Sequence, residues 1–227
     1  MKRGITAVVL AITLTLGCGG VALSQASFDP KEKTETLIYR ANYYNENKNY
    51  AAALEIYRFL VETQTNAIAQ SNLGTMYDRG SGVAQDYKEA LRLYELAAAQ
   101  GNAFAQFNLG AMYDNGRGVT EDKAEAVKWY RLAAAQGSVL AQFNLGVMYD
   151  KGEGVAQDLI QSYKCLYLAS REASSLAWKR GTPTPADVRA DKYKETLKLK
   201  LTPEQFSEIE KSQNKFRHNP FANEQCQ

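Results

Sequence analysis

The chain has 227 residues, of which 45% are hydrophobic and 23% are charged, and its formal net charge at pH 7 is +2. Residues 27–178 hold 15 basic and 18 acidic side chains and residues 179–227 hold 10 and 7, a balance that argues against a nucleic-acid partner, which needs a clustered basic face. The only histidine, His218, lies near the C-terminus, which argues against a histidine-dependent catalytic triad and a zinc hydrolase.

The N-terminus has the pattern of a targeting segment. Lys2 and Arg3 precede an uncharged apolar run over residues 5–17, which suits a secretory signal and is short for a membrane span. Small residues before position 27 predict a signal peptide over residues 1–26. A lipoprotein signal ending before Cys18, with lipid attached to Cys18, is the alternative, although threonine stands where leucine is usual, and an uncleaved anchor is a third. Either of the first two routes exports the protein.

Residues 34–66 predict a first pair of helices. Tyr44, Tyr50, Ala53 and Tyr57 follow one another at intervals of six, three and four, around a polar turn. This spacing resembles a tetratricopeptide unit, so we expect the pair to begin a helical stack.

Three copies of a 36-residue unit follow, and each predicts two antiparallel helices. In the first copy, Leu73 and Met76 lie on one helical face, and a Gly-x-Gly turn ends the helix. Asp86, like Asp122 and Asp158 in the later copies, then provides an N-cap, with an acid or amide three residues later. Units too short to bury their own apolar face predict a solenoid with a continuous core.

The repeated run Ala-Gln-x-x-Leu-Gly-x-Met-Tyr-x-x-Gly-x-Gly-Val-x-x-Asp, followed by Ala-x-x-x-Tyr-x-x-Ala-Ala-x-Gln-Gly, resembles the Sel1-like repeat family. The resemblance implies an all-α, right-handed α-solenoid of antiparallel helix pairs, related to tetratricopeptide proteins. We place the repeats at residues 69–104, 105–140 and 141–176. Members of this family imply adaptor and scaffold roles, in bacteria often at the envelope or in host interaction.

A helical cap is predicted at residues 185–217. Thr184 and Thr202 each place a hydroxyl before a proline, which is a signal for a helix start. We expect these helices to cover the third repeat, which has lost its closing glycine, and residues 218–227 to form a flexible tail.

Two cysteines, Cys165 and Cys226, remain after removal of Cys18 with the signal. Cys165 stands where repeat 2 has Trp129 on a packing helix. We expect Cys165 to be a buried free thiol, since a disulfide to a frayed tail offers little stabilisation.

A binding surface is expected on the concave wall formed by the first helix of each repeat. Mapping Gly74, Gly110 and Gly146 onto the small-residue position of a tetratricopeptide repeat places the following residues there: Phe107, Phe143, Asp78, Asp114, Asp150, Arg79, Asn115 and Lys151. An aspartate in the last turn of a helix opposes the helix dipole, so its recurrence needs a reason. Either it accepts hydrogen bonds from the following turn, or it forms an acidic row that binds a basic or amide-bearing peptide. The two phenylalanines are core residues in one interpretation and groove anchors in the other.

The resulting hypothesis is an exported, non-enzymatic module that holds a protein or peptide in its groove, with no cofactor, no metal and no catalytic residues. The Gly-x-Gly turns at 80, 116 and 152 follow helices and lack the downstream Gly-Lys-Ser of a phosphate loop. The alternative is an enzyme, because secreted relatives of the family are regarded as β-lactam-binding or β-lactam-hydrolysing. Those relatives have a cysteine pair in each repeat, and residues 69–137 contain no cysteine.

Overall fold

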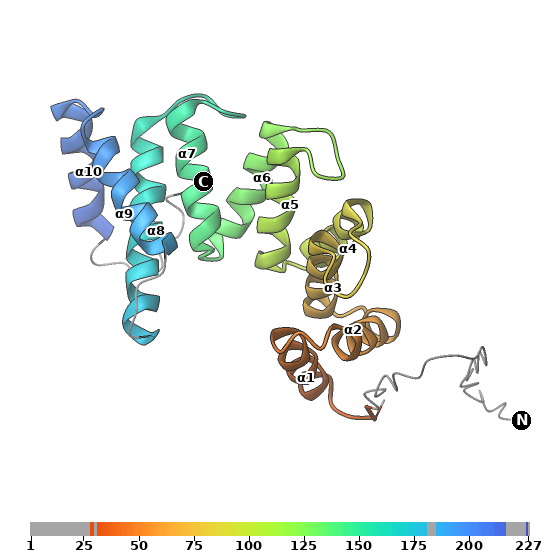
Figure 1. Cartoon of the computed structure of the whole chain (residues 1–227). Coiled ribbons are helices and arrows are strands. Elements are labelled where there is room, and N and C mark those ends of the chain that lie inside the picture. Colours follow the sequence, from red (N-terminus) through yellow and green to blue (C-terminus); the bar gives the residue numbers. More distant parts are fainter. Residues whose placement is uncertain (1–27, 30, 181–184, 217–225, 227) are drawn as a thin grey trace, which may run out of the picture.

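The computed structural model describes residues 28–29, 31–180, 185–216 and 226. These residues form ten helices stacked as antiparallel pairs in a curved row, with the N-terminal pairs at one end and α8–α10 at the other (Figure 1). The helices are α1 (Thr34–Glu46), α2 (Tyr50–Gln64), α3 (Ala67–Arg79), α4 (Tyr87–Ala99), α5 (Ala103–Asn115), α6 (Lys123–Ala135), α7 (Val139–Lys151), α8 (Leu159–Arg180), α9 (Pro185–Lys198) and α10 (Pro203–Phe216). Helices α1 to α9 each pack mainly on their neighbours in sequence, as in a solenoid, and α10 packs on α8. The predicted all-helical repeat fold is confirmed.

The turn between the two helices of a repeat is set by local sequence. Helix α3 ends at Gly80, which has a left-handed backbone with φ 68°, and its backbone N–H donates to the carbonyl of Met76. Helix α4 begins after Asp86, whose carboxylate accepts hydrogen bonds from the backbone N–H groups of Lys88 and Glu89. The caps at Asp122 and Asp158 work in the same way, so the predicted aspartate caps are confirmed.

Within each repeat, a glycine lets the two helices approach closely. A Cβ atom added at Gly110 in α5 would lie 2.7 Å from the ring of Tyr130 in α6, and Tyr130 is fully buried. The equivalent contacts are Gly74 with Tyr94 and Gly146 with Leu166. The small residue and the large residue facing it therefore form the centre of each repeat.

Neighbouring repeats meet at the second glycine of each Gly-x-Gly turn. A Cβ atom at Gly118 would lie 2.7 Å from the backbone oxygen of Tyr87, the first residue of α4 in the preceding repeat. Gly82 approaches Tyr50 and Gly154 approaches Lys123 in the same way. Each turn thus rests on the start of the second helix of the unit before it.

A ladder of buried glutamines adds polar contacts to this stack. The side chain of Gln106 accepts a hydrogen bond of 2.7 Å from Gln136 and donates one to the carbonyl of Ala98 in the preceding repeat. The ladder ends in the third repeat, where Glu172 stands at the position of Gln136. There the buried Oε1 of Gln142 has no hydrogen-bond partner among the described residues.

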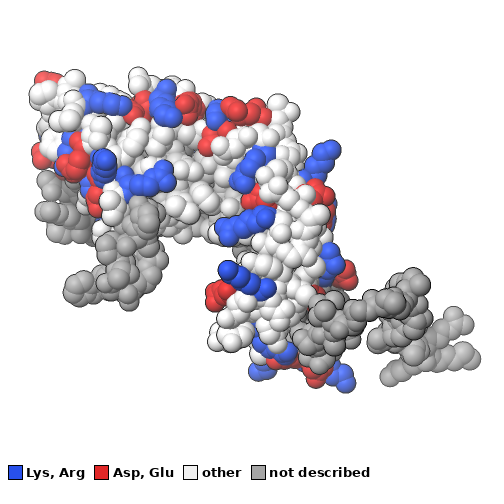
Figure 2. Space-filling view, in the orientation of Figure 1, with Lys and Arg blue, Asp and Glu red and all other residues white. Residues whose placement is uncertain are grey.

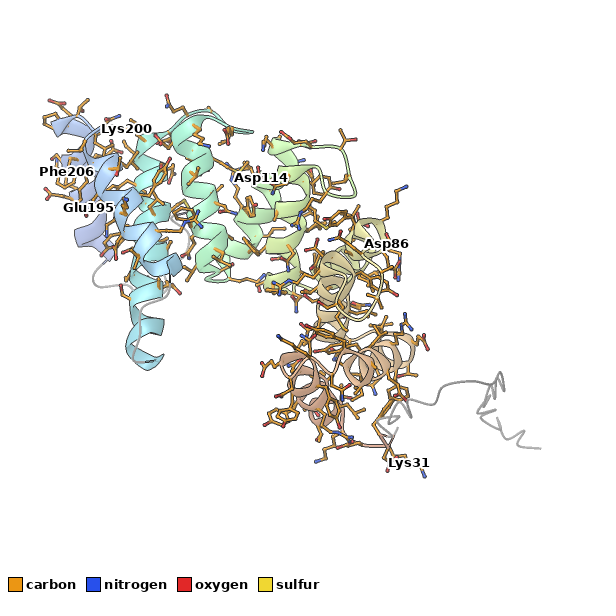
Figure 3. All side chains as sticks on the ribbon, in the orientation of Figure 1. Lys31, Asp86, Asp114, Glu195, Lys200 and Phe206 are labelled. Carbon is orange, nitrogen blue, oxygen red and sulfur yellow. A yellow bond between two sulfur atoms is a disulfide. The ribbon has the colours of Figure 1, made fainter. Side chains whose placement is uncertain are left out.

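The last two helices, α9 and α10, lie at the position of the predicted C-terminal cap and pack on α8 of the third repeat. Leu166 of α8, Leu197 of α9 and Ile209 of α10 are buried in one cluster, with Tyr163 beside them. Lys200 lies in the turn between α9 and α10, at the C-terminal end of the stack (Figure 3). Its ammonium group is 2.7 Å from the buried carboxylate of Asp150 at the end of α7. An ion pair between repeat 3 and the turn after α9 thus supplements the apolar contacts of the cap.

The expectation of a free thiol at Cys165 is wrong, because Cys165 forms a disulfide with Cys226. Cys226 is buried in the cluster that joins repeats 2 and 3. The chain end therefore returns to the solenoid at this residue. The rest of the predicted flexible tail, residues 218–227, and the predicted leader, residues 1–26, lie outside the described residues. Among the described helices, none has the length and apolarity that a membrane crossing requires.

We expect Gly110→Ala to destabilise the protein. The added methyl group meets the ring of Tyr130, and overpacking of this kind costs about 1–3 kcal/mol, more than the gain of about 1 kcal/mol in helix propensity. Thermal unfolding followed by circular dichroism measures the effect. Gly74→Ala is the milder comparison, since its nearest ring atom is 3.0 Å away. A Gly110→Ala protein that melts at or above the wild-type temperature would contradict the packing role.

Asp150→Ala should destabilise the C-terminal cap. It removes a buried carboxylate that accepts hydrogen bonds from Tyr193 and Lys200, and losing such a partner costs about 1–3 kcal/mol. The control is Glu195→Ala, which removes an exposed carboxylate paired with Lys198 and should change stability by less than about 1 kcal/mol. Urea unfolding of both variants measures the difference. Equal effects would refute the role of Asp150 in holding the cap.

Candidate functional site

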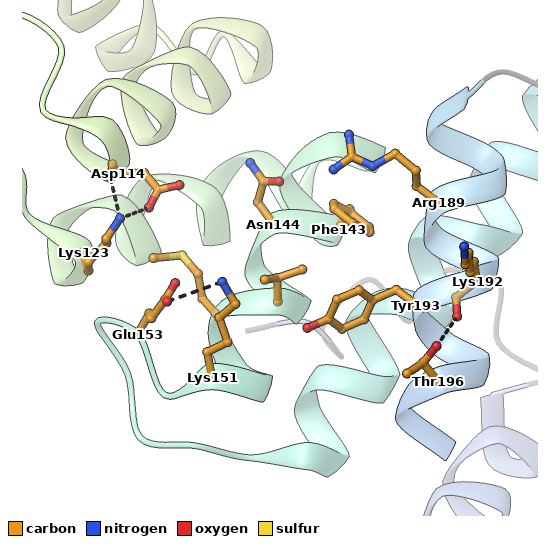
Figure 4. A pocket seen from close by; sticks show the side chains of 12 residues that line it. Asp114, Lys123, Phe143, Asn144, Lys151, Glu153, Arg189, Lys192, Tyr193 and Thr196 are labelled. Carbon is orange, nitrogen blue, oxygen red and sulfur yellow. Dashed lines mark hydrogen bonds and ion pairs between the residues drawn. The ribbon is translucent and has the colours of Figure 1, made fainter. Parts of the chain in front are cut away.

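A pocket of about 620 Å³ lies where repeat 2, repeat 3 and the cap meet (Figure 4). Helix α7 provides one wall with Phe143, Asn144, Val147, Met148 and Lys151. The facing wall is α9, with Arg189, Lys192, Tyr193 and Thr196, and the remaining lining residues are Asp114, Lys123 and Glu153. The pocket is thus built partly from repeats and partly from a helix that does not belong to them.

Aromatic and aliphatic side chains form the apolar part of the pocket. The rings of Phe143 and Tyr193 meet edge to face with centroids 6.0 Å apart, so α7 and α9 are in contact beneath the opening. The guanidinium of Arg189 lies over the Phe143 ring, 5.1 Å from its centroid. Val147 and Met148 continue this surface along α7. An apolar surface with a few polar groups around it is typical of a ligand pocket.

Four basic and two acidic residues line the pocket. Lys123 pairs with Asp114 at 2.8 Å, and Lys151 lies 3.5 Å from Glu153. Among the carboxylates whose side chains the structure describes, none lies within ion-pair distance of Arg189 or Lys192, and both of these basic side chains are exposed. The charged groups at the opening that have no ion-pair partner, Arg189 and Lys192, are therefore positive.

The three repeated aspartates are all engaged within the molecule. Asp78 pairs with Arg117 in the turn of the next repeat at 2.8 Å. Asp114 pairs with Lys123, and Asp150 pairs with Lys200 of the cap. The hydrogen bonds from the following turn go to backbone oxygens instead, as when Gln85 donates to the carbonyl of Asp78. These carboxylates bind cations of the chain itself.

Two neighbouring groups have shifted pKa values. The hydrogen bond to Asp114 raises the pKa of Lys123 above its usual value. Burial, together with the hydrogen bond to Asp150, raises the pKa of Tyr193 to about 12. At neutral pH the lysine is therefore charged and the phenol keeps its proton, and both donate to the aspartates.

The structure brings only some of the predicted surface residues together. Phe143, Asp114 and Lys151 line the pocket, and Asp150 lies beneath it, bonded to Tyr193. Phe107 does not line this pocket and packs on Tyr130, with ring centroids 5.9 Å apart.

Three other predicted residues lie elsewhere. Asp78 is engaged with Arg117, Arg79 is exposed at the end of α3, and the Asn115 amide donates to the carbonyl of Ala111 in its own helix. Arg189, Lys192 and Tyr193 line the pocket but were not expected on the binding surface. They occur once, outside the repeats, and only the helical pattern around Pro185 indicated their element.

Comparison with known proteins gives the family. The Sel1 repeat model matches residues 67–102, 103–138 and 139–174, each two residues before the boundaries expected from the sequence. None of the curated proteins matches the chain.

Several solved structures are similar, and two of them show the relationship. One is the protective antigen c5321 of uropathogenic Escherichia coli, which displays an SLR fold. It is 31% identical to this chain with a TM-score of 0.69, and the match covers 85% of this chain and 39% of the antigen. The other is a Sel1 repeat protein from Oxalobacter formigenes, 30% identical with a TM-score of 0.55 over 74% of this chain and 72% of its own. This chain thus spans about two fifths of the first protein and nearly three quarters of the second. The stacked helix pairs, the glycine contacts and these matches agree, and the chain belongs to the Sel1 repeat family.

Proposed function

We propose that the protein is an exported, non-enzymatic scaffold that binds a peptide segment of a partner protein in the pocket between α7 and α9. The observation that supports this function most directly is the pocket itself, which combines the apolar Phe143, Val147 and Met148 with uncommitted polar groups at the opening. Its volume lies within the range of roughly 300–1,000 Å³ that is common for ligand sites. Aromatic anchors with a polar rim are where binding energy concentrates.

The chemistry of the lining supports binding over catalysis. The Thr196 hydroxyl donates to the backbone carbonyl of Lys192 in its own helix, and the Tyr193 hydroxyl donates to Asp150. The ammonium of Lys123 is held by Asp114. None of these three groups is arranged as a nucleophile activated by a base. Within the described residues, no cluster of three or more metal-ligating side chains occurs.

Export is proposed from two features. Lys2 and Arg3 precede the apolar run of residues 5–17, and Cys165 is joined to Cys226 by a disulfide, a bond that persists in oxidising compartments. The E. coli relative is a protective antigen, which suits a protein at or beyond the cell envelope. We propose a periplasmic or secreted location, with a lipid anchor at Cys18 as the alternative, and a role in envelope assembly, regulation or host interaction.

A photo-crosslinking amino acid at Val147 should capture the partner in the source cells, because this side chain lines the pocket. The control position is Lys128 on α6, whose side chain is 67% exposed and does not line the pocket. Mass spectrometry of the crosslinked bands identifies the partner and the attached peptide. The same bands from both positions, or bands from Lys128 alone, would show that the binding surface lies elsewhere.

Intact-mass measurement of the protein from the cell envelope tests export and the disulfide together. We expect a mature chain that begins near Ser27 and is lighter, by two hydrogen atoms, than the same chain after reduction. A mass that begins at Cys18 and includes acyl chains would select the lipoprotein route. A mass of the full chain, residues 1–227, would refute export by cleavage.

A further inference from the structure

The acidic groups around the pocket have partners within the protein. Asp114 is bonded to Lys123, and Glu153 is 3.5 Å from Lys151. Asp150 is buried and is shared by Tyr193 and Lys200. A basic peptide would have to displace these internal cations to reach a carboxylate. The acidic row expected from the sequence is therefore a poor receptor for positive charge.

Two of the basic groups on α9 are in the opposite state, whereas Lys194 and Lys198 on the same helix pair with Asp191 and Glu195. Arg189 and Lys192 are exposed and line the pocket, and no carboxylate among the side chains that the structure describes lies within ion-pair distance of them. They are three residues apart on one helix, so their side chains are neighbours and their like charges repel. Figure 4 shows both on the wall that faces α7. A bound anion between them would relieve this repulsion.

The position of Arg189 adds geometry to this charge. Its guanidinium is held over the Phe143 ring, 5.1 Å from the centroid, so part of its freedom is already restricted. A planar guanidinium can hold a carboxylate through two parallel hydrogen bonds. The face of the molecule drawn in Figure 2 has acidic and basic side chains interspersed.

We propose that the pocket binds an acidic peptide segment, with an aspartate or glutamate carboxylate held by Arg189 and Lys192 and a neighbouring apolar side chain packed against Phe143, Val147 and Met148. The inference rests on the proposed function and specifies its partner by charge. It reverses the preference for basic peptides that the repeated aspartates suggested.

Selection from a phage-displayed library of random dodecapeptides tests the inference on the full mature chain. Peptides selected by the wild-type protein should be enriched in Asp and Glu relative to the input library, next to apolar residues. For one such peptide, Arg189→Gln should weaken binding at least about tenfold, since a charge-assisted hydrogen bond is lost. Lys192→Gln should weaken it too, and added salt should weaken wild-type binding.

The matched control is Lys88→Gln, which removes the same charge from an exposed position on α4 away from the pocket and should leave binding unchanged. Arg189→Lys should restore part of the affinity. Melting curves of the variants check that the fold is intact. Selected peptides that are neutral or basic, or that bind Arg189→Gln as tightly as wild type, would overturn the preference for acidic peptides and leave peptide binding standing. A library that yields no specific binder would overturn both proposals.

Discussion

The close approach of two helices at a glycine is the contact on which the rest of the structure depends. Gly110 against Tyr130 brings α5 and α6 together, and the same pairing recurs in the repeats on either side. A larger residue at position 110 would meet the ring of Tyr130, so the two helices would have to move apart. The pocket depends on this arrangement, because its walls come from adjacent units in the stack.

The repeated aspartates follow from the same geometry. Each lies in the last turn of a first helix, where the helix dipole disfavours negative charge, and each is compensated by a cation from a following segment, Arg117, Lys123 or Lys200. The carboxylates therefore help to join successive elements. Once they are neutralised in this way, Arg189 and Lys192 remain as the uncommitted charges of the pocket, which connects the stacking of the repeats to the proposed choice of partner.

Repetition and local signals explain how much could be predicted from the sequence. The helix pairs, the aspartate caps and the stacking follow from short motifs that occur three times. Because three copies give the same pattern, chance is a poor explanation of it. The disulfide between Cys165 and Cys226 joins residues 61 apart and has no local signal. The same holds for Arg189, whose place over Phe143 depends on how α9 docks on repeat 3. The orientation of a single non-repeated helix cannot be read from periodicity.

The methionines provide the most direct test of the binding site, since Met76, Met112 and Met148 occupy equivalent positions in three repeats and only Met148 lines the pocket. Methyl NMR of methionine-labelled protein, titrated with an acidic peptide selected on the wild-type chain, reports on all three at once. The account predicts a shift of the Met148 signal that saturates with binding, while Met76 and Met112 stay unchanged. Shifts at Met76 or Met112 with none at Met148 would contradict it.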